Sequence, residues 1–291
     1  YERMAPETLL QVCPFTELIG YHPEDVGEMV DLAKRELMVN ASLALNSGLS
    51  AHAPYTVTPE GLNVLARFAD EHSLSTTIHL AESDDEWEMF ADGAGPLYDT
   101  MRGLGRMMDD CGVGTSVQHL AKSGGFAKKT LVVHVNRLTD GDIDLLRRAN
   151  ADVVHCPRSH AWFRHARFDY DRLAKAGLNI CLGTDSLASA GGGGETVVLD
   201  MFAEMQEFSR NHPNLVTENI LQMATANGAA AMRLENELGQ IKDGFMANMT
   251  MIPFGGTLSE VPEIILHHRG PVEMLMIAGK RAFSKAGSIV D

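Results

Sequence analysis

Cysteine is scarce in this sequence, and its four cysteines form no CxxC pair. Three of them lie in apolar, strand-like runs, which predicts buried free thiols in a reducing cytoplasm. The sequence also contains no run of 18 or more apolar residues, and its N-terminus lacks the basic-then-apolar pattern of a signal peptide. We therefore expect no membrane partner and a cytoplasmic location. Because the chain begins at Tyr1, we expect these residues not to be a complete translated product.

Basic residues are in the minority as well. Lys and Arg number 24 against 39 Asp and Glu, which gives a formal charge of −15. Nucleic acid is therefore not expected as a partner, because attraction to phosphates needs clustered Lys and Arg. A neutral or cationic small molecule remains compatible with this charge, and we expect a small-molecule substrate. With 291 residues, 45% of them hydrophobic, the chain suffices for one large core or for one barrel with a small appendage.

Strand-like apolar runs alternate with helical patterns along the chain. Alternation of this kind predicts βα units and a parallel sheet that helices cover on both faces. Thr58, Thr139 and Thr217 are each predicted to cap a helix. Six strands would suit an open doubly wound sheet, whereas a barrel of eight would need two more. The predicted strands are residues 8–15, 46–53, 75–80, 130–135, 151–156 and 178–184.

The character of the sequence changes after about Leu238. Glycines separate short segments there, and residues 248–252 and 272–277 have the pattern of strands. Such a segment is too short to hold a core of its own. We therefore predict a main domain over residues 1–238 and a small C-terminal β segment over residues 239–291.

The stretch STTIHLAES places a histidine and a carboxylate close together. His79 ends a β-branched run, and Glu82 follows three residues later. In a parallel α/β protein such strand ends point into the mouth where ligands bind. A neutral imidazole is a good ligand for Zn²⁺ or Fe²⁺, and a nearby carboxylate can take a proton from water on the metal. An isolated HxxE is more often a strand-end histidine and a surface glutamate that never meet.

Other predicted strands end in similar groups. His52, His134, His155 and Asp185 each lie at or near the end of a different strand. A single histidine in this position is more often a satisfied core residue. Five metal-competent groups at successive strand ends are harder to ascribe to packing, because each would need a buried hydrogen-bond partner if it had no ligand. We therefore expect chemistry, and not packing alone, at these strand ends.

Taken in order, the motifs HAPY, HLAE, VVHVN, HCPRSH and GTDS resemble the amidohydrolase superfamily. Within it the chain is similar to the aminohydrolase branch, which includes S-adenosylhomocysteine/5′-methylthioadenosine deaminases, aminodeoxyfutalosine deaminases and triazine chlorohydrolase-like proteins. This resemblance implies a (β/α)8 TIM-type barrel with one divalent metal, Zn²⁺ or alternatively Fe²⁺. It also implies hydrolytic deamination of an aminopurine nucleoside or a related heterocycle, with release of ammonia.

The resemblance assigns roles to five residues. His79 and Asp185 would be metal ligands, from the fifth and eighth strands of the barrel. Glu82 would bind substrate and carry a proton from metal-activated water to the leaving amine. His134 would stabilise or deliver the hydroxide, and His52 would contact the substrate. From these positions we predict that His79, His134 and Asp185 converge on one cation.

One part of the family pattern is missing. Its first strand carries an HxH pair of metal ligands, and no HxH occurs in these 291 residues. The match begins at what would be the third strand. Three explanations stay open: the sequence is part of a longer protein, a separate N-terminal chain completes the barrel, or the segment is lost and leaves exposed sheet edges that favour association. A homo-oligomer or a complementing N-terminal chain is thus an expected partner.

These gaps leave a second function open beside the deaminase. The chain would then be a non-catalytic barrel remnant or subunit that binds a partner chain or a nucleoside. A metal-free doubly wound ligand-binding protein is a third reading, but it leaves the strand endings HLAE and GTDS unexplained.

Overall fold

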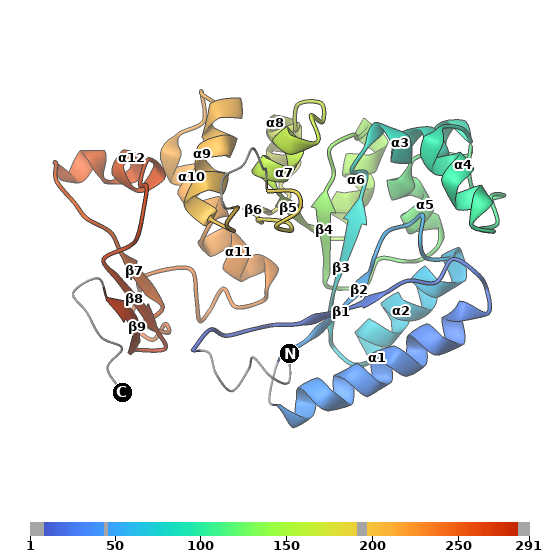
Figure 1. Ribbon diagram of the computed structural model, residues 1–291, viewed down its shortest axis with the longest axis horizontal. Coiled ribbons are helices and arrows are strands. Elements are labelled where there is room, and N and C mark those ends of the chain that lie inside the picture. Colours follow the sequence, from blue (N-terminus) through green and yellow to red (C-terminus); the bar gives the residue numbers. More distant parts are fainter. Residues whose placement is uncertain (1–8, 44–45, 191–196, 285–291) are drawn as a thin grey trace. The chain divides into compact units, whose positions relative to one another are not determined.

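The computed structural model describes residues 9–43, 46–190 and 197–284, and its main feature is a sheet of six strands in the order β1-β2-β3-β4-β5-β6 (Figure 1). The pairings from β1 to β5 are all parallel. The predicted α/β fold with a parallel sheet is therefore confirmed, while closure of the sheet into a barrel is not shown. The strands are β1 (Phe15–Leu18), β2 (Gly48–Ala51), β3 (Ser75–Leu80), β4 (Thr130–His134), β5 (Asp152–His155) and β6 (Ile180–Leu182).

The chain divides into two compact units, which are described separately below. Among the described residues, the first unit holds 12–154 and 165–179. The second holds 9–11, 155–164 and the residues from 180 onward. None of the helices in the described part of the chain combines the length and the apolar character that are needed to cross a membrane.

Helices α1 (Asp25–Ser42) and α2 (Pro59–Glu71) lie side by side against the first strands of the sheet (Figure 1). The start of α2 follows from its sequence, since the Thr58 hydroxyl accepts a hydrogen bond from the Gly61 amide at 3.1 Å. Pro59 occupies the first turn, where its missing N–H costs nothing. The apolar face of α2 is buried against the strands and supplies part of the core of the first unit.

The remaining helices of the first unit follow β3, β4 and β5. Helix α6 begins with a complete capping box, in which Thr139 and Asp142 each bond the other's backbone amide. This confirms the predicted cap. The helices are α3 (Asp84–Trp87), the π-helical turn η1 (Glu88–Asp92), α4 (Pro96–Gly103), α5 (Ser116–Lys122), α6 (Asp140–Arg148) and α8 (Tyr170–Lys175).

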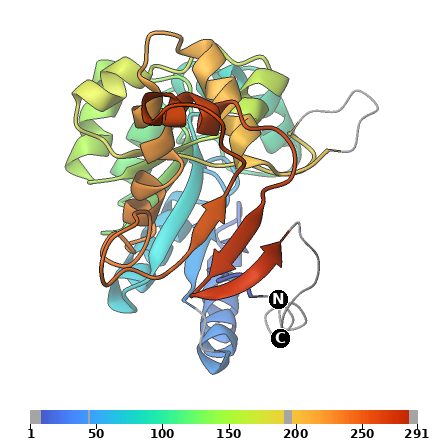
Figure 2. The same ribbon diagram turned by 90° about the vertical axis from the view of Figure 1, so that its left-hand side faces the viewer.

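In the second unit, α10 packs against α9, α11, α12 and β6. Phe208 and Ile220, both fully buried, lie in this packing. A separate antiparallel sheet of three strands, coloured orange to red in Figure 2, confirms the predicted C-terminal β segment. The strands of this small sheet are β7 (Met249–Met251), β8 (Met274–Ile277) and β9 (Lys280–Ser284). The helices of the second unit are α7 (Pro157–Trp162), α9 (Met201–Asn211), α10 (Thr217–Met223), α11 (Ala226–Ala231), the 3-10 helix η2 (Leu258–Glu260) and α12 (Val261–Leu266).

Two local predictions were wrong. The predicted strand 8–15 overlaps β1 only at Phe15, and residue 8 lies outside the described residues. Pro14 explains the late start, because it has no amide to donate and contributes only its carbonyl, which accepts the Gly48 amide at 2.8 Å. The second error concerns Thr217, which does not cap α10 but is its first residue. Its hydroxyl instead hydrogen-bonds the Glu263 carboxylate.

Candidate active site

Three of the predicted histidines lie together at the carboxyl ends of β2, β3 and β4. The ring centroids of His52 and His79 are 5.2 Å apart, and those of His79 and His134 are 5.5 Å apart. The parallel register produces this cluster, since Leu80 pairs with His134 and the His79 amide bonds the His52 carbonyl at 3.0 Å. Groups that follow one another at the ends of parallel strands therefore meet at one edge of the sheet.

The hydrogen bonds of His79 fix which ring nitrogen faces outward. Its Nδ1 lies 2.8 Å from the His52 carbonyl oxygen. A carbonyl oxygen can only accept, so Nδ1 carries the proton and Nε2 keeps its lone pair. Metal-bound histidines are commonly held in this way, with the second nitrogen donating to a carbonyl or carboxylate. His79 thus has the tautomer that a metal ligand needs.

His52 is held by a similar arrangement. Its Nδ1 lies 2.7 Å from Thr56 Oγ1, whose own proton is donated to the Ala53 carbonyl at 3.2 Å. The hydroxyl therefore accepts from Nδ1, and Nε2 of His52 is the acceptor nitrogen. Burial, followed by the nearby ring of His79, lowers the pKa of His52, and the more distant Glu17 opposes this shift. A neutral ring that accepts a hydrogen bond is thus favoured at this position.

Glu82 reaches the cluster from the turn after β3. Its Oε1 lies 3.6 Å from Nε2 of His134, which is 3% exposed, while the Glu82 side chain remains 23% exposed. The backbone takes the left-handed conformation at Ala81, with φ of 51°, and at His134, with φ of 78°. Non-glycine residues rarely adopt this conformation, and it is concentrated at functional sites. The first unit therefore brings His52, His79, Glu82 and His134 close together.

Asp185 belongs to the second unit, after β6, where φ is 54°. Its Oδ2 accepts a hydrogen bond from the Ser159 hydroxyl at 2.5 Å, and its Oδ1 accepts the Ser186 amide at 2.7 Å. The side chain of Ser186 contacts Ser189 rather than the carboxylate. Since His79 and His134 lie in the first unit and Asp185 in the second, their convergence on one cation stays a prediction.

The metal-binding potential of the described residues is partial. Nowhere in residues 9–43, 46–190 and 197–284 do three or more His, Cys, Asp or Glu side chains form a group arranged to hold a metal ion. The donors themselves fit a divalent cation, because His79 presents a bare Nε2 and Asp185 a carboxylate that a hydroxyl and an amide hold in place. The chain thus offers part of a ligand set.

Sequence reasoning missed Glu86 on α3, the buried carboxylate behind this site. Its exposed fraction is 1%, and its two oxygens accept the amides of Ala81 and Glu82, each at 2.8 Å. Burial raises its pKa to about 7, against hydrogen bonds from Ser116 and from these two amides, which lower it. In the sequence Glu86 is one acid in the run ESDDEWE, and nothing local shows which acid is buried.

Ser159 and Asn136 were also missed. Both lie inside motifs that carry the family resemblance, HCPRSH and VVHVN, so their proximity in sequence to His155 and His134 was the available signal. His155 packs against His160 and Phe208, with ring centroids 5.1 and 5.7 Å away, so it lies in the core of the second unit.

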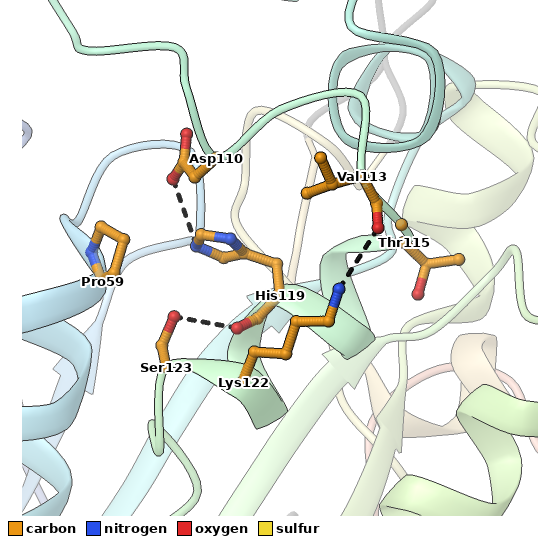
Figure 3. Close-up of a pocket in the computed structure, with 8 residues that line it drawn as sticks. Pro59, Asp110, Val113, Thr115, His119, Lys122 and Ser123 are labelled. Carbon is orange, nitrogen blue, oxygen red and sulfur yellow. Dashed lines mark hydrogen bonds and ion pairs between the residues drawn. The ribbon is translucent and has the colours of Figure 1, made fainter.

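A pocket of about 230 Å³ in the first unit shares no lining residue with the histidine cluster (Figure 3). Asp110 on its wall is paired with the buried guanidinium of Arg106 through two contacts of 2.7 Å, and lies 3.6 Å from Nε2 of His119. Burial lowers the pKa of His119 to about 4. The charges of Asp110 and Arg106 are paired with each other, so we assign Arg106, Asp110 and His119 a structural role. The pocket is lined by Pro59, Asp110, Val113, Gly114, Thr115, His119, Lys122 and Ser123.

Comparison with known proteins shows the family of this chain. A family model described as "Amidohydrolase family" matches residues 8–282. The chain belongs to the amidohydrolase family. Among the relatives of this amidohydrolase is a 5-methylthioadenosine/S-adenosylhomocysteine deaminase of Thermococcus sibiricus, 31% identical over 242 residues, which are 79% of this chain and 51% of the relative. An aminodeoxyfutalosine deaminase of Deinococcus radiodurans is 32% identical over 74% of this chain and 52% of its own length.

Solved structures support the fold of this amidohydrolase. Aminofutalosine deaminase of Helicobacter pylori matches with a TM-score of 0.81 at 24% identity, covering 97% of this chain and 71% of its own. A zinc-bound adenosine deaminase of Xanthomonas campestris matches with a TM-score of 0.68 at 24% identity, covering 83% and 52%. At this identity the likeness shows the fold alone. The chain spans about half the length of the curated relatives it matches.

Proposed function

We propose that this amidohydrolase is a metal-dependent hydrolytic deaminase of an aminopurine nucleoside or a related heterocycle. The observation that carries the proposal is the placement of Glu82, whose carboxylate lies 3.6 Å from His134 Nε2 beside the bare Nε2 of His79. Relatives at about 30% identity are named as deaminases of adenosine-type compounds. In the reaction, water adds to the ring carbon, the C–N bond breaks, and ammonia leaves.

His79 and Asp185 are the proposed metal ligands in this chain. When bound by these residues, Zn²⁺ or Fe²⁺ would supply hydroxide near neutral pH, because such a metal lowers the pKa of water from its bulk value towards about 7. The Ser159 hydroxyl donates a hydrogen bond to Asp185 Oδ2 and thereby fixes the orientation of the Asp185 carboxylate. The zinc named in the Xanthomonas campestris structure supports a divalent metal in the family.

The other residues act on protons and substrate. Glu82 accepts the proton of the attacking water and passes it to the leaving amine, which requires a carboxylate that is partly accessible and close to the site. His134 lies against Glu82 and stabilises the attacking hydroxide through Nε2. His52, with its acceptor nitrogen outward, takes a hydrogen bond from the substrate.

The test is a screen for ammonia release over adenosine derivatives, with added Zn²⁺ and after treatment with a chelator. Release that depends on the metal supports the proposal. The expected control is Glu60→Ala, which removes an exposed carboxylate on α2 and should leave the rate unchanged. The proposal fails if no derivative releases ammonia at a metal stoichiometry of one per protein.

A second candidate is a non-catalytic subunit that binds a nucleoside or a partner chain. It is favoured by one observation, the lack of any HxH pair in a chain that spans about half of its relatives. The partner would be a second copy or an N-terminal chain that pairs with β1, the end strand of the described sheet. This candidate predicts nucleoside binding that a chelator leaves unchanged, together with no ammonia release.

A further inference from the structure

The turn that carries Glu82 is held on all of its backbone polar groups. The amides of Ala81 and Glu82 donate to the two oxygens of Glu86, each at 2.8 Å. The carbonyl oxygen of Ala81 accepts the Asn136 amide at 2.8 Å, and that of Glu82 accepts Asn136 Nδ2 at 2.9 Å. Glu86 of α3 and Asn136 of the loop after β4 thus bind the amides and the carbonyls of both residues of the turn.

The chemistry of Glu86 suits this task. An ionised carboxylate is the side chain that accepts at two oxygens without donating, so it can bind two amides that point the same way. Ser83 Oγ accepts the Glu86 amide at 3.1 Å and thereby fixes the start of the short helix that presents the carboxylate. Burying such a group is unfavourable without full hydrogen bonding, and here the bonds are made to the turn itself.

The backbone of the turn needs such support. Ala81 lies in the left-handed region, with φ of 51°, which is unfavourable by about 1 kcal/mol for a residue with a side chain. Without the bonds from Glu86 and Asn136, the peptide would relax towards ordinary conformations. The Glu82 carboxylate would then leave its place 3.6 Å from His134 Nε2.

Asn136 also joins the two halves of the Glu82–His134 pair. It follows His134 by two residues, and its amide and side chain both bond the segment of Glu82. Asn136 therefore contributes, together with Glu86, to the relative position of the carboxylate and the imidazole. Displacements of about 1 Å at a reacting group can lower a rate by about 10²-fold.

We propose that Glu86 and Asn136 are positioning residues, which set the reach of the Glu82 carboxylate towards His134 by fixing the Ala81–Glu82 peptide. This inference rests on the proposed role of Glu82. It adds two residues that touch neither the substrate nor the metal and that act through the backbone of the proton carrier.

The experiment compares Glu86→Gln and Asn136→Asp with wild type. Glutamine has one acceptor oxygen, so one of the two amides loses its partner, and aspartate at 136 cannot donate to the Glu82 carbonyl. For both variants we expect kcat for ammonia release to fall by about 10- to 100-fold with KM within about threefold, because the substrate contacts remain. Amide hydrogen exchange at residues 81 and 82 should become faster in Glu86→Gln.

Asp142→Asn is the matched control. Asp142 is an equally buried carboxylate, 0% exposed, that accepts a backbone amide, but it belongs to the capping box of α6 and does not contact the turn. This variant should lose stability while kcat and exchange at residues 81 and 82 stay unchanged. Thermal unfolding of all variants shows which of them fold. If Glu86→Gln does not fold, Asn136→Asp still tests the inference.

Glu82→Ala separates the two ways of failing. If Glu82→Ala is inactive while Glu86→Gln and Asn136→Asp keep wild-type kcat, the inference is overturned and the proposed function stands. If Asp142→Asn loses as much kcat as Glu86→Gln and Asn136→Asp, the inference is overturned as well, because the loss would then reflect general destabilisation. If Glu82→Ala keeps full turnover, the proposed function itself fails, and with it a catalytic purpose for the turn.

Discussion

Nδ1 of His79 lies 2.8 Å from the main-chain oxygen of His52, the residue that directly follows the neighbouring strand β2. The contact sets the tautomer of His79 and the spacing of the two rings at once. It requires the parallel register of β2 and β3, in which the His79 amide bonds the same oxygen at 3.0 Å. The orientation of the proposed ligand thus follows directly from strand pairing.

Replacing His79 tests its role as a ligand. His79→Ala removes the bare Nε2, so we expect zinc bound per protein after dialysis to fall well below that of wild type. The control is His72→Ala, since His72 lies at the end of α2, where its ring stacks on Phe68. Elemental analysis measures both, and an unchanged zinc content in His79→Ala would show that His79 is not a ligand.

Ser159 and Ser186 both contact the Asp185 carboxylate, but only Ser159 does so through its hydroxyl. Ser159→Ala removes the hydrogen bond to Asp185 Oδ2, whereas Ser186→Ala removes a hydroxyl that contacts Ser189 instead. Loss of a residue that orients a ligand typically weakens metal binding by about 10- to 100-fold. We expect that loss for Ser159→Ala alone, measured by competition with a zinc indicator. Equal affinities for the two variants would contradict it.

The buried His119 should make stability depend on pH. Burial lowers its pKa from 6.5 to about 4, so the unfolded chain takes up a proton more readily than the folded protein. This contribution is fully present above pH 6.5 and is lost as the pH falls towards 4, on the order of 3 kcal/mol in total. Urea unfolding at pH 7 and 4.5 should show a smaller drop for His119→Gln than for wild type, and His72→Gln should match wild type.

Glu86 should have the opposite dependence. Burial raises its pKa from 4.5 to about 7, so the folded protein favours the protonated acid more than the unfolded chain does. Its stabilising contribution is therefore present below pH 4.5 and is lost as the pH rises through 7. The free energy of unfolding of wild type minus that of Glu86→Gln should decrease between pH 4.5 and 8. A constant difference would show that the acid does not titrate in this range.

The sequence predicted those features that depend on local pattern. β3 was placed correctly because Thr76, Thr77 and Ile78 form a β-branched run, and the capped start of α2 followed from Thr58 and Pro59. Strand-end histidines were identified because parallel strands align their ends. The start of β1 was misplaced because the apolar run before Pro14 is not paired.

Long-range hydrogen bonds could not be predicted in the same way. Glu86 has the S-x-x-E spacing of a helix cap with Ser83, but that spacing does not show that its carboxylate binds the turn at Ala81. Ser159 contacts Asp185 across 26 residues, after an intervening helix and strand. Such pairs depend on how packed elements meet, so the side chains that support the candidate site could not be predicted from the sequence.

The most direct measurement for this account is the rate of ammonia release by zinc-loaded Glu82→Ala compared with wild type. General acid–base groups contribute about 10²- to 10⁴-fold to a rate, so we expect a loss of at least about 10²-fold with zinc content unchanged. Turnover by Glu82→Ala at the wild-type rate would contradict the account, because the carboxylate beside His134 would then not carry the proton.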